Sequence, residues 1–350
     1  MLKEQPITLV SSKTEPQNLI ASKLALVFKK ERSYVRILFI IPPGITEEYF
    51  FLDLARNRRY SCFPPYGAGV LARNLEQRGY TTDIVDLNYL ILDLANDRSA
   101  EFNHKIWRQY LHDKLRDFSP DLIGISCMFT MTHETMKEIA SLVKNHNPDI
   151  PVIAGGVHPT NASEAVLREC SQIDFISKYE SDKSFPDLID FINGKADLSK
   201  ITQISAMIDG DYIEVTQRAT PTSNEINTTP LYHNLPIGRY SSTGQIGVYE
   251  FLVPGAKTTS VLANRGCRAK CSFCSVRSFN GLGVRGRNIV SVVDEMERCV
   301  QEYGISHFEW LDDDLFYDKA RTVMIFNEII KRKLGISWSA SNGVIPAAIT

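Results

Sequence analysis

The chain has 350 residues, of which 43% are apolar, and this length favours two domains over one, each with its own core. Its 39 basic and 41 acidic side chains give a net charge of −2, so the composition indicates neither a nucleic-acid partner nor a membrane surface. The longest strongly apolar run, 35–41, is far shorter than the ~20 residues that span a bilayer. No secretion signal is recognisable at the N-terminus. We therefore expect a cytoplasmic protein.

A polar leader, 1–33, is followed by apolar runs that alternate with stretches of helical period, which is typical of α/β folds. Five short strands are predicted at Val35–Ile41, Thr82–Val85, Leu122–Ser126, Val152–Ala154 and Phe175–Ser177. Helices are predicted at Gly67–Arg78, Phe102–Phe118, His133–Asn145, Ser163–Cys170 and Phe185–Asn193. This pattern predicts an open parallel, doubly wound sheet of the flavodoxin-like or Rossmann-like kind over 34–196, with ligands bound at the carboxyl ends of its strands.

The pattern changes over 197–258, where two alternating runs flank an Asp209-Gly210 turn and predict a β-hairpin and a connecting segment. From 259 to 350 the βα alternation resumes. Strands are predicted at Ser260–Ala263, His307–Leu311 and Ser337–Ala340, and helices at Ile289–Tyr303 and Lys319–Lys333. Three strands cannot close a barrel. If this part is barrel-like, we expect the chain to be a fragment or an incomplete gene product.

Three of the seven cysteines crowd into one loop, Cys267-Arg-Ala-Lys-Cys271-Ser-Phe-Cys274, directly after a predicted strand. An odd number of cysteines with one cluster suits metal ligation better than a disulfide framework. A structural zinc normally takes a fourth ligand at short spacing, whereas a cubane iron-sulfur cluster held by three thiolates leaves one iron open for chemistry. Zinc with a distant fourth ligand and incidental free cysteines are the alternatives.

The loop resembles the cluster motif of the radical S-adenosylmethionine (SAM) superfamily, C-x3-C-x2-C with an aromatic residue before the third cysteine, here Phe273. The resemblance implies that Cys267, Cys271 and Cys274 hold a [4Fe-4S] cluster whose open iron chelates SAM. One electron from the cluster would then split SAM into methionine and a 5′-deoxyadenosyl radical.

Acidic residues follow the next predicted strand, at the place where this superfamily contacts the SAM amino group. The run Asp312-Asp313-Asp314-Leu-Phe316 resembles the acidic motif of some branches, and Asp313 is the preferred contact. An acidic strand end that caps the following helix is the alternative for each aspartate. Ser341 and Asn342, after the third strand, stand at a plausible rim position for SAM, or in an ordinary polar loop.

The first domain, roughly Tyr34–Asn193, resembles the cobalamin-binding domain of one large subgroup of the superfamily. Ser126-Cys127-Met128 loosely matches its S-x-L signature, and Gly155-Gly156 matches its G-G signature, where missing Cβ atoms would let the backbone approach a flat ligand. The D-x-H-x-x-G signature is absent, so a bound cobalamin would have no histidine below the cobalt. Whether the charged loop within 44–64 covers the corrin is left open.

The resemblance implies a cobalamin-dependent radical SAM enzyme with three cofactors: a [4Fe-4S] cluster, SAM and cobalamin. Methyl transfer to an unactivated carbon of a small molecule or peptide is the expected reaction, with electrons from a donor such as flavodoxin or ferredoxin. The alternatives are an oxidative cyclase or rearrangement enzyme, a radical SAM enzyme that has lost cobalamin, and a non-catalytic cluster- or cobalamin-binding fragment.

Overall fold

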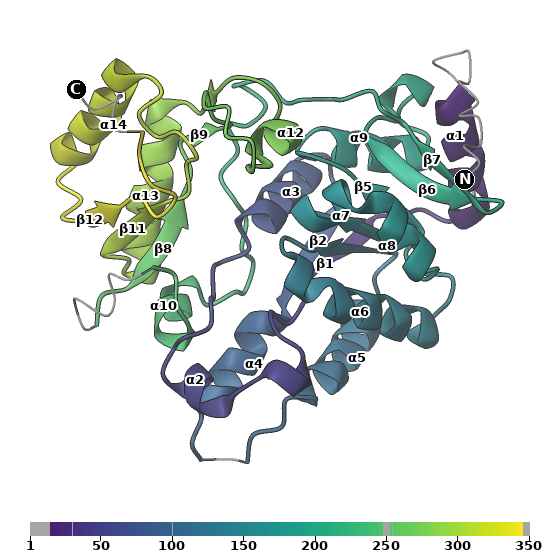
Figure 1. Cartoon of the computed structure of the whole chain (residues 1–350), viewed down its shortest axis with the longest axis horizontal. Coiled ribbons are helices and arrows are strands. Elements are labelled where there is room, and N and C mark those ends of the chain that lie inside the picture. The colour runs from purple at the N-terminus through teal and green to yellow at the C-terminus, as the bar shows by residue number, and fades with distance from the viewer. Residues whose placement is uncertain (1–14, 30, 100, 248–252, 254, 346–350) are drawn as a thin grey trace, which may run out of the picture.

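The computed structural model describes residues 15–29, 31–99, 101–247, 253 and 255–345. Figure 1 shows two sheets lying side by side, a larger one built from the first part of the chain and a smaller one built from the last part. The two sheets confirm the α/β class expected for both domains. None of the helices in the described ranges has the length and apolar character needed to cross a bilayer.

Five of the seven strands of the large sheet are parallel, in the order β2-β1-β3-β4-β5, and β2 forms one edge of the sheet. Their bounds are β1 Arg36–Ile41, β2 Thr81–Asp86, β3 Leu122–Ser126, β4 Val152–Gly155 and β5 Phe175–Ser177. This order confirms the predicted flavodoxin-like sheet. It reverses between β1 and β3, where the carboxyl edge of such sheets opens a crevice for ligands.

Helices cover both faces of the large sheet, as a doubly wound fold requires. They are α1 Glu15–Val27, α2 Leu52–Arg56, α3 Tyr66–Glu76, α4 Leu87–Asn96, α5 Ile106–Phe118, α6 His133–His146, α7 Val157–Asn161, α8 Ser163–Glu169 and α9 Ser184–Ile192. Successive strand residues point to opposite faces, so Leu38 and Ile40 join one apolar core with α5, α6 and α8. Ile37 and Phe39 join the other core with α1, α3 and α9.

Two segments that the sequence places outside the first domain are built into its core. In the leader, α1 buries Ile20 and Leu24, one helical turn apart, against the sheet. The predicted hairpin is confirmed as β6 Ile204–Ile208 and β7 Asp211–Glu214, and it adds two antiparallel strands to the large sheet beside β5. Ile204 and Ala206 lie on the buried face of β6, and this burial supplies the reason for the pairing.

The small sheet has three parallel strands in the order β12-β11-β8, with α13 and α14 packed against it. The remaining bounds are α10 Tyr240–Thr243, β8 Thr258–Val261, β9 Asn264–Arg265, α12 Val276–Asn280, β10 Arg285–Gly286, α13 Ile289–Tyr303, β11 His307–Trp310, α14 Lys319–Lys331 and β12 Ser337–Ser339. These βα units confirm the predicted first part of a TIM-like barrel. The antiparallel pair β9 and β10 forms a stem at the two ends of the cysteine loop.

A buried carboxylate joins the carboxyl ends of β8 and β11. Asp312, 1% exposed, accepts hydrogen bonds from the backbone N–H groups of Ala263 at 3.0 Å and Asn264 at 2.6 Å. Burial raises the pKa of Asp312 from its ordinary value of 3.8 to about 7, against the two N–H groups, which lower it. The stem of the cysteine loop therefore starts from a fixed and titratable anchor.

We predict that Ile204→Ala destabilises the first domain by about 2–5 kcal/mol, because it opens a cavity in a closed core. Urea unfolding of the two proteins measures the difference. Ile208→Ala, at the half-buried end of the same strand, should cost clearly less. A loss below about 1 kcal/mol for Ile204→Ala would mean that the hairpin is only loosely attached.

We also predict that the second domain loses stability as the pH rises from about 4 to 7. The raised pKa of Asp312 means that the folded state keeps a proton that the unfolded state releases between pH 3.8 and about 7. Urea midpoints measured across this range should fall less steeply in Asp312→Asn, which cannot ionise. Burial also raises the pKa of Asp86, but Asp86 is present in both proteins and cancels in the comparison. The same decrease of the urea midpoint with pH in both proteins would contradict the raised pKa of Asp312.

Candidate functional site

The structure brings Ser126 and the Gly155-Gly156 pair together at the carboxyl edge of the large sheet. Ser126 lies beside Gly155 in the register of β3 and β4, and both are half-buried. Gly156 has φ +111°, and a Cβ atom on it would collide with the carbonyl oxygen of Cys127. The glycine is therefore required by the close approach of two protein loops. A bulky residue at position 156 would disturb this backbone contact before it reached any ligand.

An apolar ledge, which the sequence reasoning missed, borders this edge. The loop after β3 exposes three large side chains, Met128 at 53%, Phe129 at 62% and Met131 at 59%. The signal for the ledge was the run Met128-Phe129-Thr130-Met131, directly after a buried strand at a ligand-binding edge. Exposed apolar side chains grouped in this way are suited to a flat, largely apolar ligand.

A hydrogen-bonded chain of side chains ties the loop after β3 to the loop after β4. His158 Nδ1 lies 3.2 Å from Thr130 Oγ1, His158 Nε2 lies 2.9 Å from His133 Nδ1, and His133 Nε2 lies 2.9 Å from Glu169 Oε2. When Glu169 is ionised and both rings are neutral, the carboxylate accepts from His133, which accepts from His158, which accepts from Thr130. All four ring nitrogens are then engaged.

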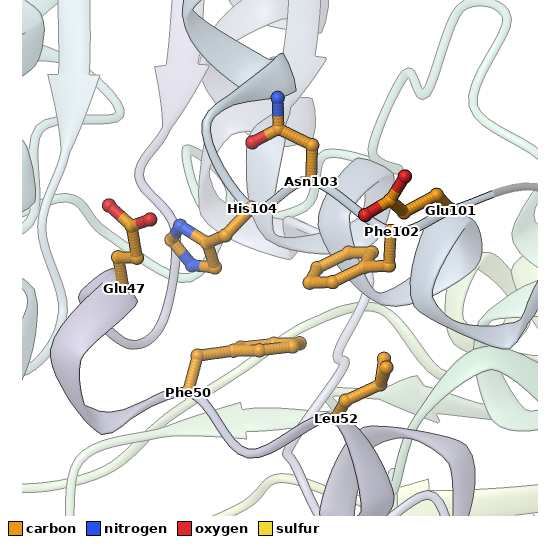
Figure 2. A pocket seen from close by; sticks show the side chains of 7 residues that line it. All are labelled: Glu47, Phe50, Leu52, Glu101, Phe102, Asn103 and His104. Carbon is orange, nitrogen blue, oxygen red and sulfur yellow. The ribbon is translucent and has the colours of Figure 1, made fainter.

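The loop after β1 is an ordered, aromatic-packed segment. Phe50 stacks on Tyr60 at 5.3 Å and on Phe102 at 5.1 Å, and Arg56 donates a hydrogen bond to the carbonyl of Ala95. A cavity of about 610 Å³ lies here, between this loop and the segment before α5 (Figure 2). Its lining residues are Glu47, Phe50, Leu52, Glu101, Phe102, Asn103 and His104. This packing argues against a merely solvated run of charges.

The three predicted cluster ligands lie on one accessible loop. Cys267 is half-buried, Cys271 and Cys274 are exposed, and the Phe273 ring is 91% exposed. Within the described ranges, no three Cys, His, Asp or Glu side chains converge to form a metal site. The residues present nevertheless fit an iron-sulfur cluster, because three thiols within eight residues are the soft donor set that such clusters take.

The structure separates the roles of the three consecutive aspartates. Asp312 is used by the backbone of the stem, and Asp314, 2% exposed, pairs with Arg268 of the cysteine loop at 2.9 Å. Asp313 is half-buried, and no hydrogen bond or ion pair joins it to another described side chain. Burial and the negative charge of Glu180 raise the pKa of the Asp313 carboxyl. Asp313 is therefore the member of the run with a carboxylate left for a ligand.

The two predicted residues after β12 lie on an exposed turn. Asn342 Nδ2 donates a hydrogen bond to the carbonyl of Leu311 at 2.8 Å, so its side chain ties this turn to the end of β11. Ser341 is also exposed. Both residues stand at the carboxyl ends of the small sheet, on the same edge as Asp313, and their contact with SAM stays a prediction.

Buried ion pairs join the edge of the large sheet to the stem of the cysteine loop. Glu180, in the loop after β5, receives two hydrogen bonds from Arg285, at 2.6 and 2.9 Å. Asp182, in the same loop, pairs with Arg265 at 2.6 Å. Sequence analysis does not identify Glu180 as a contact of the second domain, because a partner arginine 105 residues away leaves no local signal.

A third contact of this kind involves the first turn of α3. Tyr66 accepts a hydrogen bond from Arg287 at 2.7 Å, and Arg287 pairs with Glu295 of α13 at 2.8 Å. Arg287 is 1% exposed and Glu295 is 4% exposed. The two domains therefore share a polar boundary that is buried from water. In Figure 1, α12, which follows Cys274 within the cysteine loop, lies at this boundary between the two sheets.

Comparison with known proteins finds relatives of the first domain and of the chain as a whole. The B12 binding domain family matches residues 53–189. An uncharacterized methyltransferase of Pyrococcus horikoshii is 29% identical over 311 residues, which cover 89% of this chain and 60% of that protein. The anaerobic magnesium-protoporphyrin IX monomethyl ester cyclase of Rubrivivax gelatinosus is 26% identical over 286 residues, which cover 81% of this chain and 47% of the cyclase.

Among solved structures, the fold is similar to that of the radical SAM methyltransferase TsrM from Kitasatospora setae, solved with cobalamin and a [4Fe-4S] cluster bound. The TM-score is 0.61 at 20% identity, over 86% of this chain and 52% of TsrM. The chain thus spans about half to three fifths of the length of these proteins. Residues 53–189 therefore match the B12 binding domain family, and the fold of the chain is similar to that of a radical SAM methyltransferase solved with cobalamin and a [4Fe-4S] cluster.

Proposed function

We propose that this chain is the cofactor-binding part of a cobalamin-dependent radical SAM methyltransferase. The observation that carries the proposal is the buried boundary at which the carboxyl edge of the B12-binding domain meets the stem of the cysteine loop. Cobalt-borne methyl transfer and radical generation require two cofactors within reach of one substrate, and this arrangement supports that requirement.

The residues of this chain would divide the cofactors between the two domains. Cys267, Cys271 and Cys274 would hold the [4Fe-4S] cluster, which supplies one-electron chemistry to SAM when both are bound. Asp313 would receive the SAM ammonium group, since it is a half-buried carboxylate without a described protein partner. The Met128–Met131 ledge and Ser126 would lie against cobalamin.

The comparisons favour methyl transfer without specifying the substrate. A methyltransferase is named both among the relatives and among the solved structures, whereas the cyclase relative keeps oxidative ring formation as a second candidate. We propose a small-molecule or peptide substrate, a flavodoxin or ferredoxin as electron donor, and a cytoplasmic location. With SAM and a reductant, S-adenosylhomocysteine together with 5′-deoxyadenosine would support methyl transfer, and 5′-deoxyadenosine alone would favour the cyclase reaction.

We predict that anaerobic reconstitution gives about four irons per chain and that Cys271→Ala abolishes the cluster signal in electron paramagnetic resonance. The loss is expected because two thiolates cannot retain a cubane cluster that needs three. Cys170→Ala is the matched control, since Cys170 is a buried thiol of the first domain, and it should keep the full signal. Stoichiometric zinc in the wild-type protein, or an intact cluster in Cys271→Ala, would contradict the proposal.

We predict that cobalamin binds without a protein imidazole on cobalt. His133 at the start of α6 and His158 in α7 follow the strands β3 and β4, and their ring nitrogens are engaged with each other, with Glu169 and with Thr130. The paramagnetic resonance spectrum of bound Co(II) cobalamin should therefore lack hyperfine splitting from an imidazole nitrogen. His158→Ala should leave that spectrum unchanged. A nitrogen splitting that disappears in His158→Ala would overturn the prediction.

A further inference from the structure

The loop after β5 is held rigidly on the first domain before it contacts the second. Gln203, 1% exposed, donates hydrogen bonds to the carbonyls of Lys178 and Glu180, both at 2.7 Å. The N–H of Tyr179 donates to Thr160 Oγ1 at 2.9 Å, and Thr160 belongs to α7, directly after the Gly155-Gly156 turn. The loop thus continues the carboxyl edge on which cobalamin would lie.

The stem of the cysteine loop presents two arginines to this rigid loop. Arg265 and Arg285 are direct partners across the β9–β10 pair. The Arg285 guanidinium also donates to the carbonyls of Pro221 and Asn280, both at 2.8 Å, which fixes its plane. A guanidinium that makes two parallel bonds to one carboxylate fixes direction as well as distance. We call the two pairs, Glu180–Arg285 and Asp182–Arg265, the domain clamp.

Burial decides what such a clamp can contribute. The side chains of Glu180, Asp182, Arg265 and Arg285 are only 6, 7, 11 and 14% exposed. Removing charges from water costs about as much as their attraction returns, so a buried pair adds little net stability, whereas its geometry excludes other arrangements. The clamp is therefore better suited to set the relative position of two domains than to hold them together strongly.

We propose that Glu180 and Asp182 are positioning residues that set the distance between the iron-sulfur cluster and cobalamin. The inference rests on the proposed function, because it concerns where that function's two cofactors lie. It requires only contacts of this chain: the loop after β5 belongs to the edge on which cobalamin would lie, and Arg265 and Arg285 directly precede Gly266 and Gly286 at the two ends of the cysteine loop. Neither carboxylate needs to touch a cofactor.

The first experiment measures the clamp without cofactors. Amide hydrogen exchange of the chain is compared between wild type and Glu180→Gln, which keeps the shape of the side chain and removes its charge. We expect exchange in the stem, 263–266 and 285–287, to rise by about tenfold or more, with β1–β4 unchanged. Arg285→Lys keeps the positive charge but cannot make the paired hydrogen bonds of the guanidinium to Glu180, so it should give an intermediate rise in stem exchange. Unchanged stem exchange in both variants would refute the clamp, whether or not the protein binds cofactors.

The second experiment measures the distance that the clamp is proposed to set. In protein loaded with Co(II) cobalamin and the reduced cluster, the dipolar coupling of the two spins should be sharp in wild type and broadened in Glu180→Gln and Asp182→Asn at equal cofactor content. Glu164→Gln, which breaks the exposed Arg168 pair within the first domain, is the matched control and should match wild type. Equal coupling in all four proteins would refute the positioning role, whereas a wild type that binds neither cofactor would refute the proposed function.

Discussion

The arrangement of this molecule depends on pairing buried arginines with carboxylates across the boundary between its two sheets. A guanidinium buried without a partner would cost several kcal/mol, so Arg265 and Arg285 require the loop after β5 to lie where it does. That loop in turn is fixed by the side chain of Gln203, the residue that directly precedes the hairpin strand β6. The position of the hairpin in the sheet and the docking of the cysteine loop therefore depend on each other through the loop after β5.

The three aspartates after β11 differ in their contacts, and only Asp313 is influenced by a charge of the first domain. Asp312 accepts hydrogen bonds from the backbone of the stem, and Asp314 pairs with Arg268 in the first turn of the cysteine loop. The cysteine loop is therefore held at both places. Asp313 lies between them without a described partner and within the field of Glu180. A cationic group brought to this place would relieve the repulsion between the two carboxylates, which supports the proposed contact of Asp313 with the SAM ammonium group.

On the first domain, the carboxyl edge combines a rigid backbone with an adaptable apolar surface. Gly156 lets the loop after β4 touch the loop after β3, and His158 ties the same two loops by side-chain bonds. The methionines and the phenylalanine of the ledge remain exposed above them. Methionine side chains adjust readily to an irregular apolar partner, so the ledge suits a bulky, largely apolar ligand such as the proposed cobalamin.

The sequence by itself determined the two α/β domains, the five parallel strands and the cysteine loop, because hydrophobic period, turn residues and ligand spacing are all local signals. It could not predict that α1 and the hairpin pack into the core of the first domain, because Ile20 and Ile204 are buried there by residues that are distant in the sequence. Nor could it choose among Asp312, Asp313 and Asp314, since neighbours in sequence differ there only in their long-range partners. Tertiary structure alone decided which charges are paired, because the arginines and carboxylates of the clamp are 83 and 105 residues apart along the chain.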